Sequence, residues 1–274
     1  MLKLKVQNFC LDSSINSGQF FRYNKIGDFY YIVLIDRVVK LKLEDGYLII
    51  YSSNYNNLED LIVEFFDLNT DYNEINKKLI EIDSNLKYIV DSCINFKILK
   101  MEPFETLVSY VISQNNSVNN IKNIVNKLSI NYGKKILFEN NEYYLFPTFD
   151  SIKDITLEEL KSLKLGFRSN YVYELLNNIK TNKLNLDYIY SLNTIDAMNY
   201  LILNKGIGKK VASCVLLFAY KRYDVFPIDT WVKKIMGELF NISNEKKIEE
   251  FIKENYKEYS GIIIQYLFNY KRNN

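Results

Sequence analysis

The sequence predicts an α+β protein, in which a small N-terminal antiparallel sheet with helices precedes a mainly α-helical bundle. Residues 1–52 are rich in β-branched and aromatic side chains that partly alternate with polar ones, as strands do. From about Leu58 apolar residues recur at helical spacing instead. The 274 residues include only three prolines and nine glycines, so no flexible linker is expected. We place the boundary after residue 95, with residues 1–95 as an α+β domain and residues 96–274 as a helical region of two subdomains around a cleft.

Three runs in the front region are expected to be strands joined by short turns. They cover residues 29–35, 37–43 and 47–51, and Asp36 and Asp45-Gly46 separate them. Connections as short as these predict an antiparallel meander.

Helices are expected where apolar stripes repeat every three or four residues. The first two stripes lie at residues 58–65 and 75–82, and Pro103 begins the next helix. Pro147 and Gly166 mark breaks between helices. The remaining predicted segments are 118–131, 157–163, 169–181, 194–203, 209–220, 230–240 and 244–273.

Composition excludes several kinds of chemistry. The chain contains no histidine, which rules out Ser–His–Asp and Cys–His catalysis and histidine-ligated zinc. Cys10, Cys93 and Cys214 are widely separated, so we expect no metal site, no iron–sulfur cluster and no cofactor, and we expect a reducing compartment. The net charge of +2 permits nucleic-acid binding without requiring it.

Location and assembly are predicted from missing signals. Residues 1–10 do not resemble a signal peptide, and no apolar run is long enough to span a membrane. We therefore expect a cytoplasmic protein without a membrane partner, associated with the nucleoid if the source is prokaryotic. No coiled-coil pattern is present, so we expect a monomer.

Gly206-Ile207-Gly208 lies between two predicted helices and matches a helix–hairpin–helix motif. Two glycines allow a tight turn whose backbone N–H groups can approach an anion such as a DNA phosphate. The alternative is an ordinary corner between helices, with glycine at a C-cap. The flanking Lys205 and Lys209 favour the anion-binding interpretation.

Lys210 follows the hairpin, in the first turn of the second helix. Lys210, Cys214 and Phe218 are spaced at i, i+4 and i+8, so the lysine continues an otherwise apolar face. The alternative is a solvated surface lysine. Asp229 follows Pro227 and is predicted to cap the next helix, where its carboxylate would be rigid and anionic. The pair is a candidate amine nucleophile with a carboxylate that stabilises developing positive charge.

Several segments together resemble the 8-oxoguanine DNA glycosylase family of the helix–hairpin–helix glycosylase superfamily. The resemblance follows the order of the family's motifs along nearly the whole chain. The matching segments are Ser17-Gly18-Gln19-Phe20-Phe21-Arg22-Tyr23, Pro103-Phe104-Glu105, Ser113-Gln114-Asn115-Asn116, Leu165-Gly166-Phe167-Arg168-Ser169-Asn170-Tyr171-Val172, the hairpin with Lys210, Pro227-Ile228-Asp229, Tyr259-Ser260-Gly261 and Leu267-Phe268.

The resemblance implies roles for the residues around the reacting nucleotide. Lys210 would attack C1′, expel the base and form a Schiff base that can undergo β-elimination, and Asp229 would stabilise the oxocarbenium-like transition state. The Gly18 carbonyl would accept the N7–H that distinguishes 8-oxoguanine from guanine. Cys214 and Phe268 would enclose the flipped base. Further expected pocket residues are Phe218, Pro227 and Gln265.

The resemblance also implies contacts with DNA outside the pocket. Phe167 would fill the gap in the base stack, and Asn115 and Arg168 would contact the cytosine opposite. Gly206 and Gly208 would hold a phosphate through their backbone.

Four positions depart from the family pattern. Ser117 stands where the family has a third asparagine. The glutamine that contacts the Watson–Crick edge falls on Ile264 in an ungapped register, although Gln265 is adjacent. An arginine that checks the opposite base falls near Asn120, so we expect relaxed discrimination for cytosine. Trp231 replaces a phosphate-binding histidine.

We therefore predict a bifunctional DNA glycosylase and AP lyase that excises 8-oxoguanine from double-stranded DNA during base excision repair. One alternative is a monofunctional glycosylase for alkylated bases, which would not need Lys210. Another is a non-catalytic helix–hairpin–helix DNA-binding protein, in which Lys210 and Asp229 contribute to affinity alone.

Overall fold

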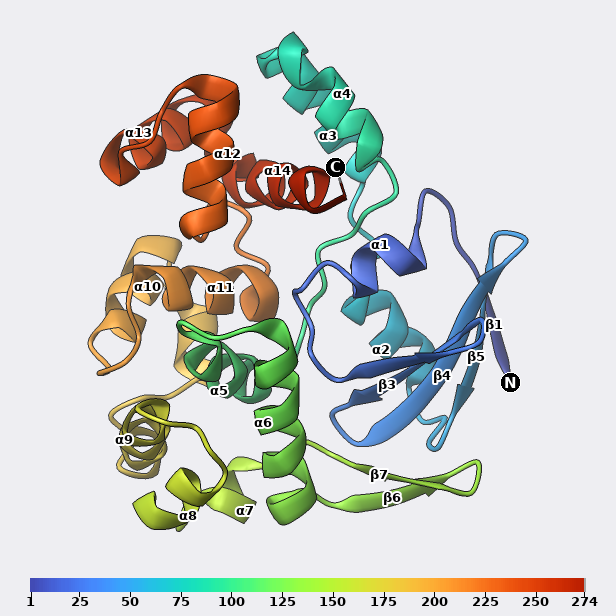
Figure 1. Ribbon diagram of the computed structural model, residues 1–274. Coiled ribbons are helices and arrows are strands. Elements are labelled where there is room, and N and C mark those ends of the chain that lie inside the picture. Colours follow the sequence, from blue (N-terminus) through green and yellow to red (C-terminus); the bar gives the residue numbers. More distant parts are fainter. Residues whose placement is uncertain (274) are drawn as a thin grey trace.

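The computed structural model describes residues 1–273 and confirms the α+β architecture (Figure 1). A five-stranded antiparallel sheet lies at one side of the molecule, in the strand order β1-β5-β4-β3-β2, and helices form the rest. The strands are β1 (Leu2–Lys5), β2 (Tyr23–Ile26), β3 (Phe29–Leu34), β4 (Arg37–Glu44) and β5 (Tyr47–Ser52). The three predicted runs are the central meander β3-β4-β5, and β1 and β2 add an edge strand on either side.

The sheet folds because its strands are amphipathic. Along β3, Tyr30, Ile32 and Leu34 are buried and alternate with half-exposed neighbours, so one face packs against the core. Figure 1 shows α1 (Leu11–Ile15) and α2 (Leu58–Phe65) beside the sheet.

Helices from the whole length of the chain build the rest of the molecule. In order they are α3 (Tyr72–Ile82), α4 (Lys87–Ser92), α5 (Pro103–Ser113), α6 (Val118–Tyr132), α7 (Phe149–Ile152), α8 (Leu157–Ser162), α9 (Arg168–Lys180), α10 (Thr194–Ile202), α11 (Lys209–Tyr220), α12 (Thr230–Phe240), α13 (Glu245–Tyr256) and α14 (Ser260–Asn273). Short 3₁₀ turns cover Ser84–Leu86, Asp187–Ser191 and Lys257–Tyr259. Within residues 1–273, no helix has both the length and the apolar character needed to cross a bilayer.

Several elements differ from the prediction. The helices α1, α4 and α7 and the edge strands β1 and β2 were not predicted. The single segment expected at 244–273 is two helices, because Lys257 adopts a φ of 44° and breaks the hydrogen-bonding pattern between α13 and α14. A hairpin of β6 (Lys135–Phe138) and β7 (Asn141–Tyr144) was not predicted. Its turn residues have positive φ angles, which suits the twist of a two-residue hairpin turn.

Contacts run across the predicted domain boundary. The rings of Tyr88 in α4 and Tyr270 in α14 lie 5.4 Å apart, and the Tyr266 hydroxyl donates to Asn76 Oδ1 at 2.8 Å. Figure 1 shows α3 and α4 beside the C-terminal helices α12 to α14. The division after residue 95 therefore stays a proposal, with α3 and α4 lying against the second unit.

The buried helices α5 and α11 pack together and position the site. Residues 104–113 of α5 and 211–220 of α11 are buried throughout. The rings of Tyr110 and Phe218 stack at 5.5 Å between these helices. The end of α5 therefore lies against the second half of α11, the helix whose first turn carries Lys210.

Candidate active site

The predicted chemical groups line one pocket of about 210 Å³. Segments that are distant in the sequence contribute to it, namely the stretch after α1, the end of α5, α11, the start of α12, and α14. The predicted residues that line it are Gly18, Lys210, Cys214, Phe218, Pro227, Asp229, Gln265 and Phe268. The structure therefore brings together every residue proposed for the reaction and for the base pocket.

Lys210 faces the pocket from the first turn of α11. Gly208 is the N-cap of this helix, and Lys210 is half-buried on the same face as Cys214 and Phe218. Its neighbour Lys209 is exposed and forms an ion pair with Glu249 at 3.4 Å. Lys210 itself forms no ion pair with any residue among 1–273, so its amine is not already bound to a carboxylate.

Asp229 lines the same pocket and is held rigidly. Its Oδ1 accepts a hydrogen bond from the backbone N–H of Val232 at 2.9 Å, which confirms the predicted N-cap of α12. The cap fixes the carboxylate at the pocket.

Cys214 forms an apolar part of the wall. Burial raises the pKa of its thiol to about 12, while the nearby charge of Lys210 opposes this rise and that of Asp229 adds to it. The thiol is therefore neutral at physiological pH and is not a competing nucleophile.

Gly18 lies on a strap, residues 17–19, that is fastened to the core by Gln19. Gly18 has a φ of +86°, which favours glycine. The Gln19 side chain donates to Ser17 Oγ and Lys97 O and accepts from Leu99 N. Tyr110 Oη also donates to the carbonyl oxygen of Gln19 at 3.0 Å. Gln19 belongs to a segment that resembles the family, but no role was predicted for it. Its hydrogen bonds show that it positions the strap.

The structure distinguishes Gln265 from Ile264. Gln265 lines the pocket, whereas Ile264 is completely buried in the core on another face of α14. Gln265 is therefore the side chain of the two that can contact a molecule in the pocket.

The predicted DNA contacts Asn115, Phe167 and Arg168 lie together outside the pocket. The Arg168 guanidinium is buried and donates to the carbonyl oxygens of Gln114, Asn115 and Leu165. It also lies 4.5 Å from the ring centroid of Phe167, which is 49% exposed. Arg168 thus organises the segment that presents Asn115 and Phe167 to the outside.

The hairpin is joined to the same segment. Gln114 Nε2 donates to the carbonyl oxygen of Gly206 at 2.9 Å. Gly206 has a φ of +86°, and a Cβ there would approach Tyr171 Cγ to 2.4 Å. At Gly208 a Cβ would meet nothing within 4 Å, and the backbone conformation suits any residue. Of the two hairpin glycines, the packing of the protein therefore requires only Gly206.

Ten further residues line the pocket without having been assigned to it. Five of them lie in the segments that resemble the family, namely Ser17, Gln19, Phe21, Ser113 and Asn116, and Trp231 was noted only as the replacement of a phosphate-binding histidine. The other four are Tyr110, Val118, Ile121 and Val232.

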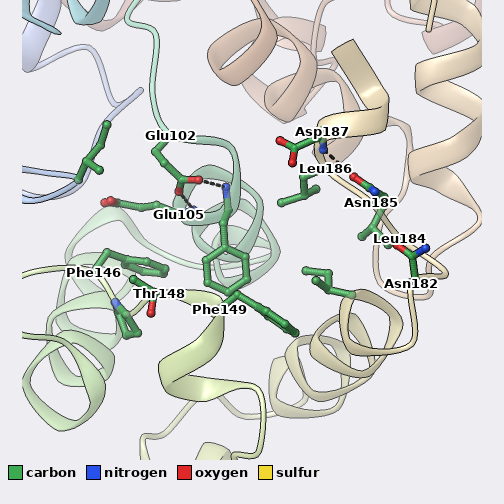
Figure 2. A pocket seen from close by; sticks show the side chains of 14 residues that line it. Glu102, Glu105, Phe146, Thr148, Phe149, Asn182, Leu184, Asn185, Leu186 and Asp187 are labelled. Carbon is green, nitrogen blue, oxygen red and sulfur yellow. Dashed lines mark hydrogen bonds between the residues drawn. The ribbon is translucent and has the colours of Figure 1, made fainter. Parts of the chain in front are cut away.

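A larger cavity of about 470 Å³ lies at the other end of α5 (Figure 2). Figure 2 shows the carboxylate of Glu102 bonded to the backbone at the start of this helix, with Phe149 facing the cavity. Glu105, which is buried, also lines it. This cavity includes none of the predicted site residues. The candidate active site is therefore the smaller of the two cavities.

Comparisons with known protein families agree with the fold and the pocket. Residues 1–107 match the family described as "8-oxoguanine DNA glycosylase, N-terminal domain", and residues 108–258 match "HhH-GPD superfamily base excision DNA repair protein". Fold and pocket together define the class of helix–hairpin–helix DNA glycosylases. The chain belongs to the HhH-GPD superfamily and, within it, to the 8-oxoguanine DNA glycosylase family.

Individual relatives extend over nearly the full chain. A structure of the 8-oxoguanine glycosylase/lyase of Clostridium acetobutylicum, bound to duplex DNA with cytosine opposite 8-oxoguanine, is 36% identical with a TM-score of 0.93, covering 98% of this chain and 93% of that one. A protein of Methanothermobacter thermautotrophicus named "Probable N-glycosylase/DNA lyase" is 26% identical, covering 99% of this chain and 96% of its own. The 3-methyladenine DNA-glycosylase of Archaeoglobus fulgidus, 20% identical with a TM-score of 0.83, covers 99% and 98% and shares the fold.

Proposed function

We propose that this protein is a bifunctional DNA glycosylase and AP lyase that excises 8-oxoguanine from double-stranded DNA. The observation that carries the proposal is the convergence of Lys210, Asp229, Gly18 and Gln265 on one pocket beside a helix–hairpin–helix turn. An amine nucleophile, a fixed carboxylate and polar groups for a base are the components that this reaction needs. We further propose that it works as a monomer in the cytoplasm, associated with the nucleoid if the source is prokaryotic.

Lys210 supplies the nucleophile in this mechanism. Its neutral amine forms a bond from Nζ to C1′ of the damaged nucleotide, and the bond from C1′ to the base breaks. The electron pair leaves with the base, which takes up a proton. Opening of the sugar ring gives a Schiff base. Loss of a C2′ proton then breaks the bond to the 3′ oxygen and cleaves the strand.

Asp229 stabilises the positive charge that develops on the sugar as the base departs. Its carboxylate lies at the pocket wall and is fixed by its bond to Val232, so no reorganisation is needed during the reaction. The carboxylate therefore favours the transition state over the uncharged ground state.

The base is recognised by groups on opposite walls. The Gly18 carbonyl accepts the N7–H of 8-oxoguanine, and normal guanine would leave that carbonyl facing a lone pair. An unmatched buried polar group costs about 1–3 kcal/mol, which is enough to reject guanine about 5- to 150-fold. Gln265 contacts the Watson–Crick edge, and Cys214 and Phe268 enclose the ring.

Outside the pocket, Phe167 fills the gap left in the stack, while Asn115 contacts the opposite base with the support of Arg168. The backbone of Gly206 and Gly208 holds a phosphate, because helix N-termini and close-approach glycines favour anions.

The proposal is tested by incubating the protein with duplexes that contain 8-oxoguanine, an alkylated purine or only normal bases. We expect release of 8-oxoguanine together with strand cleavage. Release of the alkylated base without strand cleavage would favour the monofunctional alternative, to which the fold is also suited. Tight binding without release of any base would favour the non-catalytic alternative. Either result would overturn the proposal.

A further inference from the structure

Trp231 stands at the mouth of the pocket and is the single tryptophan of the chain. It is the second residue of α12, two positions after Asp229, and it is 52% exposed. The capping bond of Asp229 fixes the backbone that carries it. The Lys234 ammonium lies 5.9 Å from the centroid of the indole, a contact that favours this position of the ring.

The pocket changes character from its interior to its mouth. Cys214 and Phe218 are each 3% exposed and Gln265 is 6% exposed, so the interior is closed to solvent. At the rim, Val118 at the start of α6 is 42% exposed and lines the pocket together with Trp231. Exposed apolar side chains at the rim of a site are typical of a surface that another molecule covers.

The reaction determines which part of a nucleotide reaches this rim. When the base fills the interior, C1′ must lie beside Lys210, and the remainder of the deoxyribose must extend toward the mouth. Trp231 lies on that side, because it follows Asp229 in the same helix turn and lines the same pocket. An indole offers a large, rigid apolar face with little conformational entropy to lose.

We propose that the indole of Trp231 packs against the deoxyribose of the extruded nucleotide and holds C1′ within reach of Lys210. This inference rests on the proposed function and adds a substrate contact to it. The contact does not depend on which base has been extruded, so it selects for extrusion itself, while Gly18 and Gln265 select the base.

Because the chain has one tryptophan, its fluorescence reports on this position alone when excitation avoids tyrosine. The Lys210→Gln variant, which cannot form the Schiff base, is titrated with three duplexes that contain 8-oxoguanine, a tetrahydrofuran abasic analogue or only normal bases. We expect both lesion duplexes to protect the indole from acrylamide quenching, and the undamaged duplex to protect it less. If bound abasic duplex left the quenching unchanged, the inference would be wrong.

Kinetics give an independent test. Trp231→Ala is expected to slow single-turnover release of 8-oxoguanine by about 5- to 150-fold, the range for loss of one aromatic contact with a nucleotide. Trp231→Phe should restore most of the rate, and neither variant should change the melting temperature. Leu137→Ala is the matched control, since it removes a side chain that is 69% exposed from the β6-β7 hairpin.

The outcomes separate this inference from the proposed function. If the wild-type protein releases 8-oxoguanine and Trp231→Ala is equally fast, the inference fails and the proposed function stands. Equal losses of the release rate in Trp231→Ala and Trp231→Phe would also contradict packing of an aromatic ring against the deoxyribose. If the wild-type protein releases no base, the proposed function fails, and the abasic duplex still decides whether Trp231 contacts the sugar.

Discussion

Arg168 holds the main chain of Asn115, because its Nη2 donates to the Asn115 carbonyl oxygen at 2.7 Å. Asn115 adopts a φ of 47°, and its side chain is exposed. A residue proposed to contact the opposite base is thus held in an uncommon backbone conformation by another residue of the same group. We therefore propose that Arg168 acts on the opposite strand through Asn115 and Phe167 rather than by touching it.

Replacing Arg168 by lysine tests this arrangement. A single ammonium cannot bond the carbonyls of Gln114, Asn115 and Leu165 together, so Asn115 should lose its fixed position. We expect excision of 8-oxoguanine opposite cytosine to slow by about tenfold, which corresponds to about 1.4 kcal/mol. Single-turnover rates opposite the four bases measure this effect. Arg222→Lys is the control, because Arg222 also donates to a main-chain carbonyl, that of Leu192. Equal rates for Arg168→Lys and the wild type would contradict the role.

The two hairpin glycines should respond differently to alanine. Gly206→Ala is expected to lower the melting temperature, because its positive φ and its contact with Tyr171 both exclude a Cβ. Gly208→Ala should cost at most about 1 kcal/mol of stability, the usual preference at an N-cap, yet weaken binding to undamaged duplex by blocking the approach of a phosphate. Calorimetry and DNA-binding titrations at fixed salt measure the two effects. Unchanged DNA affinity in a folded Gly208→Ala variant would argue against phosphate binding here.

Gln265 and Ile264 form a matched pair of adjacent residues. Gln265→Ala should reduce the rate of 8-oxoguanine excision with little change in melting temperature, since it loses base contacts worth about 1–3 kcal/mol. Ile264→Ala should lower stability by about 2–5 kcal/mol, because it leaves a cavity in the core. Thermal unfolding and single-turnover assays below the melting temperature separate the effects. If Ile264→Ala lost discrimination between 8-oxoguanine and guanine and Gln265→Ala kept it, Ile264 rather than Gln265 would be the residue that contacts the base.

Glu105 should make stability depend on pH. Burial raises the pKa of its carboxyl to about 7, although the charge of Arg22 opposes this rise and that of Glu102 adds to it. Because the pKa of Glu105 in the folded protein lies above the ordinary value of 4.5, its stabilising contribution is complete below about pH 4.5. It is lost as the pH rises toward 7, by up to about 3 kcal/mol. The chain has no histidine to titrate in this window.

Urea unfolding of the wild type and Glu105→Gln across this pH range measures the contribution. The wild-type free energy of unfolding, relative to that of the variant, should fall as the pH rises and then level off above 7. Glu158→Gln, at an exposed position, is the control. Parallel curves for the wild type and Glu105→Gln would show that Glu105 is not the group responsible.

The elements that carry a local pattern were predictable. Buried and exposed side chains alternate along β3, α5 begins with proline, and α12 is capped by Asp229. A few neighbouring residues are therefore enough to predict each of these elements. The single segment expected at 244–273 was wrong because Lys257 breaks the helix without glycine or proline. The β6-β7 hairpin was missed because Glu139-Asn140 is a weaker turn signal than a glycine pair.

The chemical part of the site was predictable for a similar reason, since the spacing of Lys210, Cys214 and Phe218 defines one helix face. The residues that position these chemical groups were not predictable. Gln19 and Tyr110 are joined at the pocket by a contact between distant segments, and no local pattern encodes such a contact. The same holds for Gln265 and Ile264, because only the packing of α14 decides which of two neighbours faces the core.

The role of Lys210 as the nucleophile is tested most directly by capturing its covalent intermediate with DNA. The protein is incubated with an 8-oxoguanine duplex and borohydride, and the adduct is located by mass spectrometry. We expect a trapped complex in the wild type and in Lys209→Gln, because Lys209 is exposed and paired with Glu249 rather than facing the pocket. We expect none in Lys210→Gln. Undiminished trapping in Lys210→Gln, or an adduct at another residue, would contradict the central claim.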